Sequence, residues 1–358
     1  MGMLRLTLAL AVLLAHLPGA PFTFVHGGLA VQAFFIISGF YMALVLDGKY
    51  ADRGLFYSNR LLRLAPSYLA MMVVCAIGLF GFGVSVTATP EVFMTAFSDP
   101  ATAVVMAFEN VFVVGQELLF WLRIGPDGGL IYDPSGALPS ETNTLAWQAL
   151  LVPQSWSLSM ELMFYAMAPF LARMRWTTLL VIALASVALR FAGHLLPLDY
   201  PLWSSRLFPT ALFMFLMGML AHRALPWASK APRWMGAVLG LALVAGLVLM
   251  PLTGLRGEAA RWLVYVGVAV VTPFAFNAFK AVKWDRWIGE LSYPLYLCHL
   301  FVIALALTVT PEQAVPVAIV GSIAMSVLLV MLIEQPVDRW RQARVQRRLA
   351  TLENPPVF

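Results

Sequence analysis

The stretch LTLALAVLLAHLPGAPFTFVHGGLAVQAFFIISGFYMALVL, residues 6–46, contains no Asp, Glu, Lys or Arg. It holds most of two apolar runs, 5–24 and 28–46. Each run is close to the roughly 20 residues that a helix needs to cross a hydrocarbon core of about 30 Å. A soluble domain needs charge on its surface, so this stretch indicates that lipid is the solvent.

The whole chain shows the same composition. Of its 358 residues, 61% are hydrophobic and 11% are charged, whereas roughly a quarter are charged in an ordinary soluble domain. A bilayer requires internally satisfied backbones, which leaves helices or a closed barrel. Barrel strands alternate polar and apolar residues, but the apolar runs here are continuous, which favours helices. The sequence therefore predicts an all-α, polytopic membrane protein.

Ten segments qualify as transmembrane helices: 5–24, 28–46, 64–83, 156–172, 176–195, 207–223, 234–252, 261–280, 290–309 and 314–334. An eleventh apolar segment, 101–122, carries Glu109, Asn110, Gln116 and Glu117, which are costly in a lipid-exposed span. We predict about ten transmembrane helices, and we interpret 101–122 as a re-entrant or interfacial element.

The distribution of basic residues predicts the orientation. If the N-terminus is cytoplasmic and 101–122 does not cross, 18 of the 23 Lys and Arg residues lie inside. The five on the outer side are Arg123, Arg190, Arg206, Arg256 and Arg261. The positive-inside rule then places both termini in the cytoplasm. We divide the chain into a transmembrane domain, 1–338, and a basic cytoplasmic tail, 339–358, with a lipid-binding patch as the alternative reading of the tail.

The first residues allow another interpretation. Arg5, the apolar run after it and the small residues Gly19 and Ala20 also resemble a secretory signal peptide. The apolar stretch continues past that point without an A-x-A cleavage site. This pattern favours a retained first helix.

Several polar residues fall at membrane depth, where ionisable groups are functional candidates. His16 lies eleven residues after Arg5, about 16 Å along the first helix, and His299, Ser38 and Glu161 reach the same depth from other spans. A histidine can take the proton of a hydroxyl near neutral pH, and a carboxylate such as Glu161 can orient it. The alternative is a histidine satisfied by a neighbouring helix.

Arg60 and Arg63 form an R-x-x-R pair on one helical face at the predicted cytoplasmic mouth of the third span. Two guanidinium groups at this spacing suit phosphate oxygens, although either arginine alone fits a topology anchor. Cys75 and Cys298 lie in apolar runs without metal-ligand spacing. We expect no metal site and no nucleic-acid partner.

Six segments in order resemble the acyltransferase 3 family of membrane-bound O-acyltransferases. They are R-x10-H from Arg5 to His16, GGLAVQAFFIISGF (27–40), NRLLRLAPSY (59–68), SWSLSMELMFY (155–165), ELSYPLYLCH (290–299) and EQPVDRW (334–340). The resemblance implies a ten-helix domain that uses acyl-CoA, most often acetyl-CoA, to modify extracytoplasmic glycans, lipids or small metabolites. It also implies an enzyme of the bacterial cytoplasmic (inner) membrane.

The resemblance also assigns roles to residues. It implies His16 as the catalytic histidine, with Glu161 as its predicted partner, and Arg5, Arg60 and Arg63 as the residues that hold the coenzyme. The substrate and pore residues are Ser38, Trp156, Ser157, Tyr296 and His299. One departure is Gln32, which stands where an acidic residue is common. Some relatives carry an esterase-like domain after the membrane part, and this chain stops at Phe358. We therefore expect the membrane domain or a separate partner to complete the acceptor chemistry.

The sequence thus predicts an acyl-CoA-dependent O-acyltransferase that moves an acyl group to an extracytoplasmic hydroxyl. The acyl group that we expect is acetyl. A transient acyl-histidine is an open variant. A secondary transporter or flippase is the alternative, because midplane polar residues also mark transport pathways. It predicts inverted repeats, which the two halves do not show. A catalytically silent scaffold is the third possibility. The sequence carries no signature of the acceptor, the acyl chain length or the oligomeric state.

Overall fold

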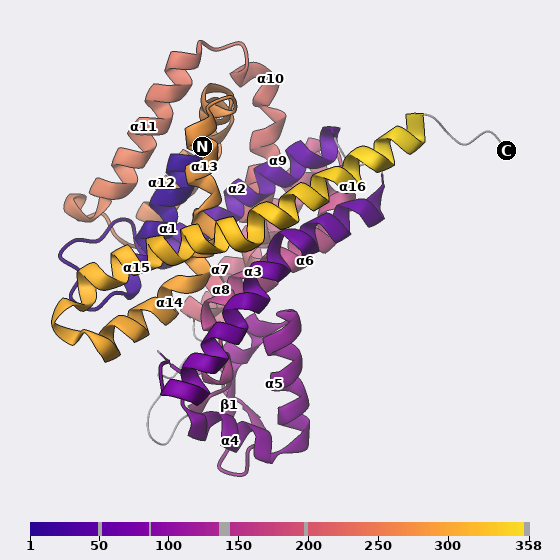
Figure 1. Ribbon diagram of the computed structural model, residues 1–358. Coiled ribbons are helices and arrows are strands. Elements are labelled where there is room, and N and C mark those ends of the chain that lie inside the picture. The colour runs from indigo at the N-terminus through magenta and orange to yellow at the C-terminus, as the bar shows by residue number, and fades with distance from the viewer. Residues whose placement is uncertain (49–51, 86, 136–143, 197–199, 354–358) are drawn as a thin grey trace.

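The protein is almost entirely helical (Figure 1), as its composition predicts. The computed structural model describes residues 1–48, 52–85, 87–135, 144–196 and 200–353. The α-helices are α1 (Gly2–His16), α2 (Gly27–Gly48), α3 (Arg53–Phe82), α4 (Pro90–Ser98), α5 (Pro100–Phe112), α6 (Trp156–Leu171), α7 (Trp176–Ala192), α8 (Tyr200–Arg206), α9 (Phe208–Arg223), α10 (Leu225–Ala228), α11 (Arg233–Leu249), α12 (Gly257–Phe279), α13 (Lys283–Glu290), α14 (Ser292–Val309), α15 (Ala314–Leu329) and α16 (Gln335–Glu353).

Shorter elements connect these helices. The 3-10 turns are η1 (Gln116–Trp121), η2 (Ala146–Ala149), η3 (Pro153–Ser155), η4 (Gly193–Leu195), η5 (Met250–Thr253) and η6 (Pro311–Gln313), and η7 (Val330–Glu334) is a π-helical turn. Three short strands, β1 (Leu122–Ile124), β2 (Leu130–Tyr132) and β3 (Thr144–Leu145), form an antiparallel sheet in the order β2-β1-β3.

A helix lies in each of the ten predicted segments, but the predicted number of spans is not confirmed. By length and apolar composition, seven helices of the described ranges can cross a membrane, or eight if the bent pair α8 and α9 is one span. The 15 residues of α1 and the 16 of α6 give lengths of about 23 Å at 1.5 Å per residue, short of a hydrocarbon core. The chain is an integral membrane protein.

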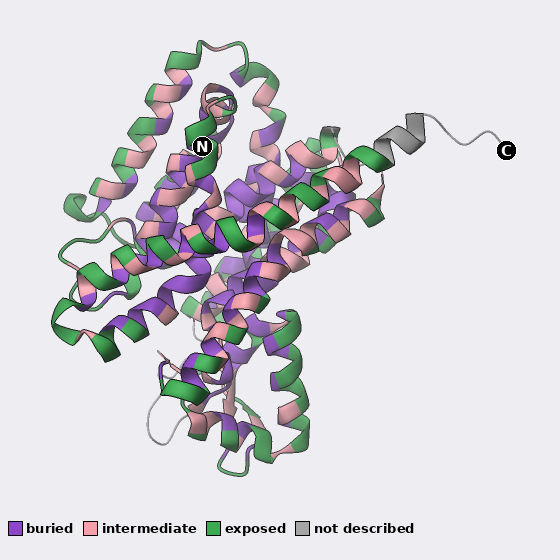
Figure 2. Cartoon of the chain, viewed as in Figure 1, coloured by how far each residue is buried: buried purple, intermediate pink, exposed green. Residues whose placement is uncertain are grey.

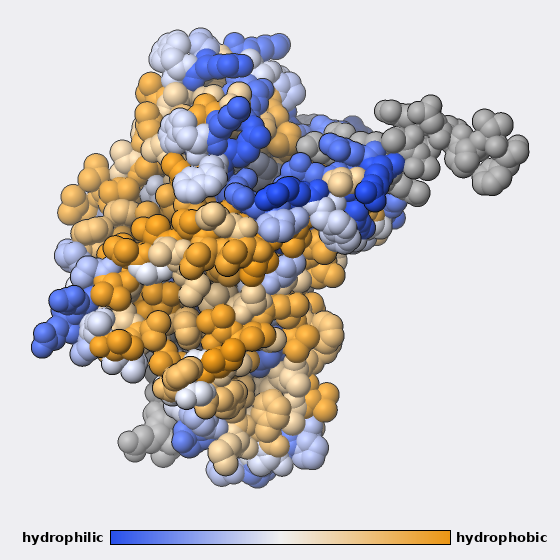
Figure 3. All heavy atoms as spheres, in the orientation of Figure 1, coloured by the Kyte–Doolittle hydropathy of each residue, from blue (hydrophilic) through white to orange (hydrophobic). Residues whose placement is uncertain are grey.

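On the face shown in Figure 3, an apolar band crosses the middle of the molecule. Large apolar side chains are exposed on several of the long helices, among them Ile77, Phe80, Val181, Leu263, Val320 and Leu332. Hydrophilic residues gather beyond the band. We call the end that carries the N-terminus, α10, α13 and α16 the basic end, and the opposite end, with α4 and the strands, the sheet end (Figure 1). In Figure 2 the buried residues lie where the helices face one another, and exposed residues lie on their outer sides.

The segment 101–122 does not form one spanning helix. Its helix α5 has 13 residues, about 20 Å, and it ends where Val113 and Gly115 take positive φ values of 69° and 105°. The polar side chains that argued against lipid exposure are buried in protein. Asn110, for example, donates to the Ala149 carbonyl and accepts from the Leu151 amide. This agrees with a non-spanning element.

The basic end also fixes the first helix. The carboxylate of Asp285 in α13 lies 2.5 to 3.0 Å from the first three backbone nitrogens, including the amino group of Met1. A carboxylate at a helix N-terminus is favourable because it meets the unpaired N–H groups and the positive end of the dipole. This contact sets the depth of Arg5 and His16, which both lie on α1.

The helix at the other terminus continues through the predicted domain boundary. The turn η7 joins α15 to α16 without a break, and α16 runs across position 338. The side chains of Arg339 and Arg341 face the cavity described below. The last predicted tail residues, 354–358, lie outside the described residues.

Helices α2 and α9 cross at close range because glycines meet backbone. A Cβ on Gly39 would lie 1.9 Å from the Phe215 carbonyl oxygen, and one on Gly218 would lie 1.9 Å from that of Ile36. Small residues at such crossings let membrane helices pack closely. The SGF element of residues 38–40 therefore has a packing role.

We expect Gly39→Ala to destabilise the protein by about 3 kcal/mol or more, because the added methyl group forces the two backbones apart. Gly246→Ala in α11 is the control, since a Cβ there meets nothing within 4 Å and alanine favours the helix by about 1 kcal/mol. Thermal unfolding in detergent measures both. Equal unfolding temperatures for the two variants would contradict the packing role of Gly39.

Candidate functional site

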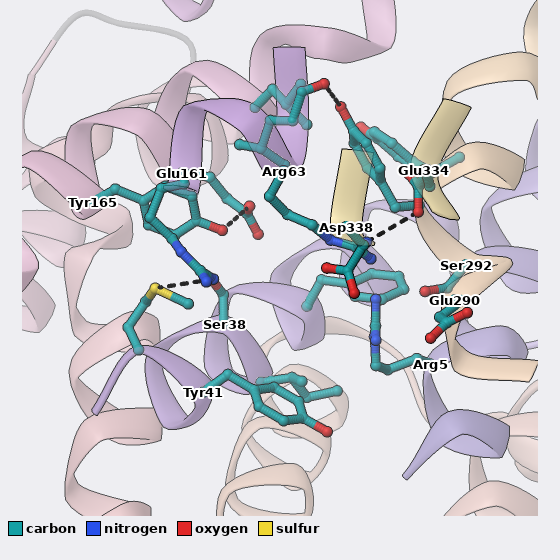
Figure 4. Close-up of a pocket in the computed structure, with 18 of the residues that line it drawn as sticks. Arg5, Ser38, Tyr41, Arg63, Glu161, Tyr165, Glu290, Ser292, Glu334 and Asp338 are labelled. Atoms are coloured by element: carbon teal, nitrogen blue, oxygen red, sulfur yellow. Dashed lines mark hydrogen bonds and ion pairs between the residues drawn. The ribbon is translucent and has the colours of Figure 1, made fainter. Parts of the chain in front are cut away.

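A cavity of about 630 Å³ extends into the bundle from the basic end. Its walls come from α1, α2, α3, α6, α14, η7 and α16, and α13 contributes to its rim (Figure 4). The volume lies within the roughly 300–1,000 Å³ of small-molecule sites. Seven of the ten predicted site residues line it: Arg5, Ser38, Arg60, Arg63, Ser157, Glu161 and Tyr296. The three that do not are His16, Trp156 and His299.

Positive charge dominates the polar lining of this cavity. Six arginines line it, Arg5, Arg60, Arg63, Arg286, Arg339 and Arg341, against four acids, Glu161, Glu290, Glu334 and Asp338. Such a lining favours an anionic ligand. Because arginine forks match phosphate oxygens, the chemistry of the cavity suits a phosphorylated molecule.

The two arginines of the R-x-x-R pair have different surroundings. Arg63 forms an ion pair with Glu334 at 3.1 Å, and Ser67 donates to the other oxygen of that carboxylate. Arg60 meets no carboxylate within the described part of the chain; its Nη1 lies 4.0 Å from the Met42 sulfur and its Nε is buried without a partner. Arg60 is thus the guanidinium that is open to a ligand.

The expected partnership of Glu161 with His16 is not what the structure shows. The Glu161 carboxylate accepts a hydrogen bond of 2.7 Å from Tyr165, one turn later in α6 (Figure 4). No hydrogen bond among the described residues joins it to His16. The hydroxyl of Ser38 also lines this region, and its oxygen is buried. Glu161 and Ser38 therefore belong to the cavity wall.

The inner wall of the cavity contains a hydrogen-bonded pair, Ser157 and Tyr296. Their hydroxyl oxygens are 2.7 Å apart, and the Tyr296 hydroxyl donates to the Gln154 carbonyl at 2.6 Å. The Tyr296 ring is 5.8 Å from the ring of His299, which is 5.2 Å from the ring of His16. The structure thus brings the two predicted histidines together, one step beyond the cavity wall.

Backbone carbonyls fix the tautomers of both histidines. Nδ1 of His16 lies 2.8 Å from the Val12 carbonyl oxygen, and Nδ1 of His299 lies 2.7 Å from that of Tyr296. A carbonyl only accepts, so each Nδ1 carries the proton and each Nε2 is free to accept one. His299 is fully buried, and its Nε2 has no hydrogen-bond partner in the part of the chain that the structure describes, whereas His16 is exposed. Backbone carbonyls therefore orient the two imidazole rings, a role that we had expected Glu161 to have for His16.

Arg206 is a residue that sequence reasoning did not place at the site. Its guanidinium carbon lies 3.9 Å from the ring centre of Phe120 and 4.1 Å from that of Trp156, a double cation–π contact. It is also within electrostatic reach of His16 and Tyr296. In the sequence, Arg206 counted only as an outer-side charge, because no local pattern links it to the distant aromatic residues that hold it.

A family model described as an acyltransferase domain matches residues 1–335. The chain belongs to the acyltransferase 3 family. The resemblance drawn from the six sequence segments is confirmed. Membership identifies this membrane protein as an enzyme that transfers acyl groups.

Two curated relatives illustrate the similarity. The exopolysaccharide production protein ExoZ of Rhizobium meliloti (strain 1021) is 26% identical over 336 residues, covering 90% of this chain and 92% of ExoZ. The O-acetyltransferase OatA of Staphylococcus aureus (strain NCTC 8325 / PS 47) is 26% identical over 325 residues, covering 81% of this chain and 48% of OatA. The acyltransferase 3 chain therefore spans about half the length of OatA. No solved structure matches it.

Proposed function

We propose that this enzyme moves an acyl group, in the first instance acetyl, from cytoplasmic acyl-CoA to a hydroxyl of an extracytoplasmic polysaccharide. The observation that carries the proposal is the arginine-lined cavity whose inner wall, Ser157 and Tyr296, adjoins the histidine pair. The printed names of the relatives, an O-acetyltransferase and an exopolysaccharide production protein, support the acyl group and the acceptor class.

The orientation is part of the proposal. We place the chain in the bacterial cytoplasmic membrane with both termini in the cytoplasm, because most Lys and Arg residues then lie inside. The basic end with its cavity then faces the cytoplasm, where acyl-CoA is made. The sheet end then faces the acceptor.

The cavity lining matches the parts of an acyl-CoA. Arg5, Arg60 and Arg63 would take its phosphates through charge-assisted hydrogen bonds. The apolar part of the wall, with Val31, Phe34, Phe35, Ile37, Val45 and Leu158, suits the neutral pantetheine arm. In this placement the thioester reaches Ser157 and Tyr296.

The residues beyond that wall supply the chemistry. Nε2 of His16 accepts the proton of the acceptor hydroxyl as its oxygen attacks the thioester carbon. The new C–O bond forms, the C–S bond breaks, and the proton passes to the departing thiolate of coenzyme A. To stabilise the oxyanion, the Tyr296 hydroxyl would turn its single proton from the Gln154 carbonyl to the thioester oxygen, while the Ser157 hydroxyl donates to the Tyr296 oxygen. His299 acts as a positioning residue beside His16.

The full-length protein in nanodiscs tests this function directly. We expect it to release free coenzyme A from acetyl-CoA, detected with a thiol reagent, and to transfer labelled acetyl to added polysaccharide. Both signals should depend on His16. Polysaccharide movement across vesicles without release of coenzyme A would support the transporter alternative and contradict the proposal.

Tyr296→Phe is expected to lower kcat by about 100-fold with little change in the KM for acyl-CoA, because an oxyanion donor acts in the transition state. The control is Tyr132→Phe, since that side chain is 63% exposed on β2 at the sheet end. Initial rates at varied acyl-CoA concentration separate the two constants. A rise in KM at unchanged kcat would assign Tyr296 to binding and refute the oxyanion role.

A further inference from the structure

A second, smaller cavity lies at the basic end, on the other side of α2 from the acyl-CoA cavity proposed above. Its volume is about 180 Å³, and it sits among the last turns of α2, α6 and α9 and the first turns of α3 and α7. The last turns of α2 separate the two spaces, with Met42 and Val45 facing the large cavity and Ala43 and Leu46 facing the small one.

This cavity is apolar at its base and basic at its rim. Leu179 and Met219 are almost completely buried and form part of the base. Arg53, Arg173 and Arg223 are exposed around it. The remaining titratable lining consists of the acid Asp47 and the buried imidazole of His222.

Two of the rim arginines are held in place by contacts that leave their charge unneutralised. Arg53 stacks over the Phe170 ring at 4.7 Å, and Arg223 donates to the carbonyls of Ala172 and Met174 at 2.9 and 3.3 Å. Among the residues that the structure describes, no ion pair joins Arg53, Arg173 or Arg223 to a carboxylate. Even with Asp47 counted, the lining carries a net charge of +2 with His222 neutral.

We propose that this cavity binds the phosphate of an anionic phospholipid headgroup. Three guanidiniums around one cavity match the oxygens of a phosphate group. Basic pockets between transmembrane helices on the cytoplasmic side are suited to anionic lipid headgroups. The site lies among helix ends at the basic end, and its apolar base suits the glycerol end of a lipid better than a fully hydrated free anion.

The test is native mass spectrometry of the full-length protein from nanodiscs of mixed phosphatidylglycerol and phosphatidylcholine. We expect the wild type to retain phosphatidylglycerol selectively. Arg53→Ala/Arg173→Ala/Arg223→Ala should weaken that retention by roughly tenfold or more, as expected when charge-assisted hydrogen bonds are lost. Lys230→Ala/Arg233→Ala/Lys283→Ala, an exposed triple outside the cavity, loses the same charge and should retain the lipid.

Arg173→Glu keeps the test valid if the triple variant fails to fold, because Arg173 is exposed and forms no ion pair with a described carboxylate. It should also reduce phosphatidylglycerol retention. Equal retention of both lipids, or retention unchanged in Arg173→Glu, would overturn the proposal. Displacement of the lipid by millimolar inorganic phosphate would also overturn it, since the site would then be one for free phosphate.

Discussion

His16→Ala is expected to reduce kcat for acyl transfer by about 1,000-fold, within the 10²–10⁴ that a positioned general base contributes. The structural reason is the hydrogen bond from Nδ1 to the Val12 carbonyl, which leaves Nε2 as the proton acceptor. His16 does not line the large cavity that we propose as the acyl-CoA site, so the KM for acyl-CoA should change little. Release of coenzyme A in nanodiscs, with acceptor present, measures both constants.

His194→Ala is the matched control, because this histidine is also exposed but, among the described residues, its ring stacks on Phe191 and Tyr200 alone, near the end of α7. It should keep full activity. The activity of His299→Asn should lie between the activities of the two alanine variants, since His299 contacts His16 through its ring but is not part of the cavity lining. Full turnover by a folded His16→Ala protein would remove His16 from the mechanism. Equal losses in His16→Ala and His194→Ala would show that the assay reports on folding alone.

The membrane fold follows from sequence because its cause is local. A charge-free run such as 6–46 has no charged side chains with which to form a water-exposed surface, so it indicates a lipid environment. A helix lies within every apolar segment that was predicted. The helix ends were harder to predict. The third helix begins at Arg53, eleven residues before the apolar run starts, because α16 packs along this polar extension, for example through the contact of Arg344 with Ser58.

The candidate site was predictable where residues act through a shared helix. Arg60 and Arg63 are three residues apart, so both face one cavity. Contacts between distant segments were not predictable. Glu161 satisfies its carboxylate on Tyr165, its own helical neighbour. A local hydrogen bond of this kind competes with any long-range partner that a motif suggests.

Arg60→Ala is expected to raise the KM for acyl-CoA by about 10- to 100-fold at nearly unchanged kcat, the loss expected for one or two charge-assisted hydrogen bonds. Arg60→Ala is a cleaner test than Arg63→Ala. Arg63→Ala leaves the buried Glu334 carboxylate without its ion pair and so destabilises the fold as well. Arg233→Ala, which removes a charge at the basic end outside the cavity, is the control and should leave KM unchanged.

The same variant can locate the phosphate that Arg60 contacts. Acyl-CoA and its 3′-dephospho analogue, each with wild type and Arg60→Ala, form a double-mutant cycle. If Arg60 binds the 3′-phosphate, removal of either partner removes the same interaction, so the two losses are not additive. If it binds the diphosphate, the two losses are independent and multiply in KM. An unchanged KM in Arg60→Ala for both substrates would show that the coenzyme does not reach this arginine, and the cavity would then lose its assignment as the donor site.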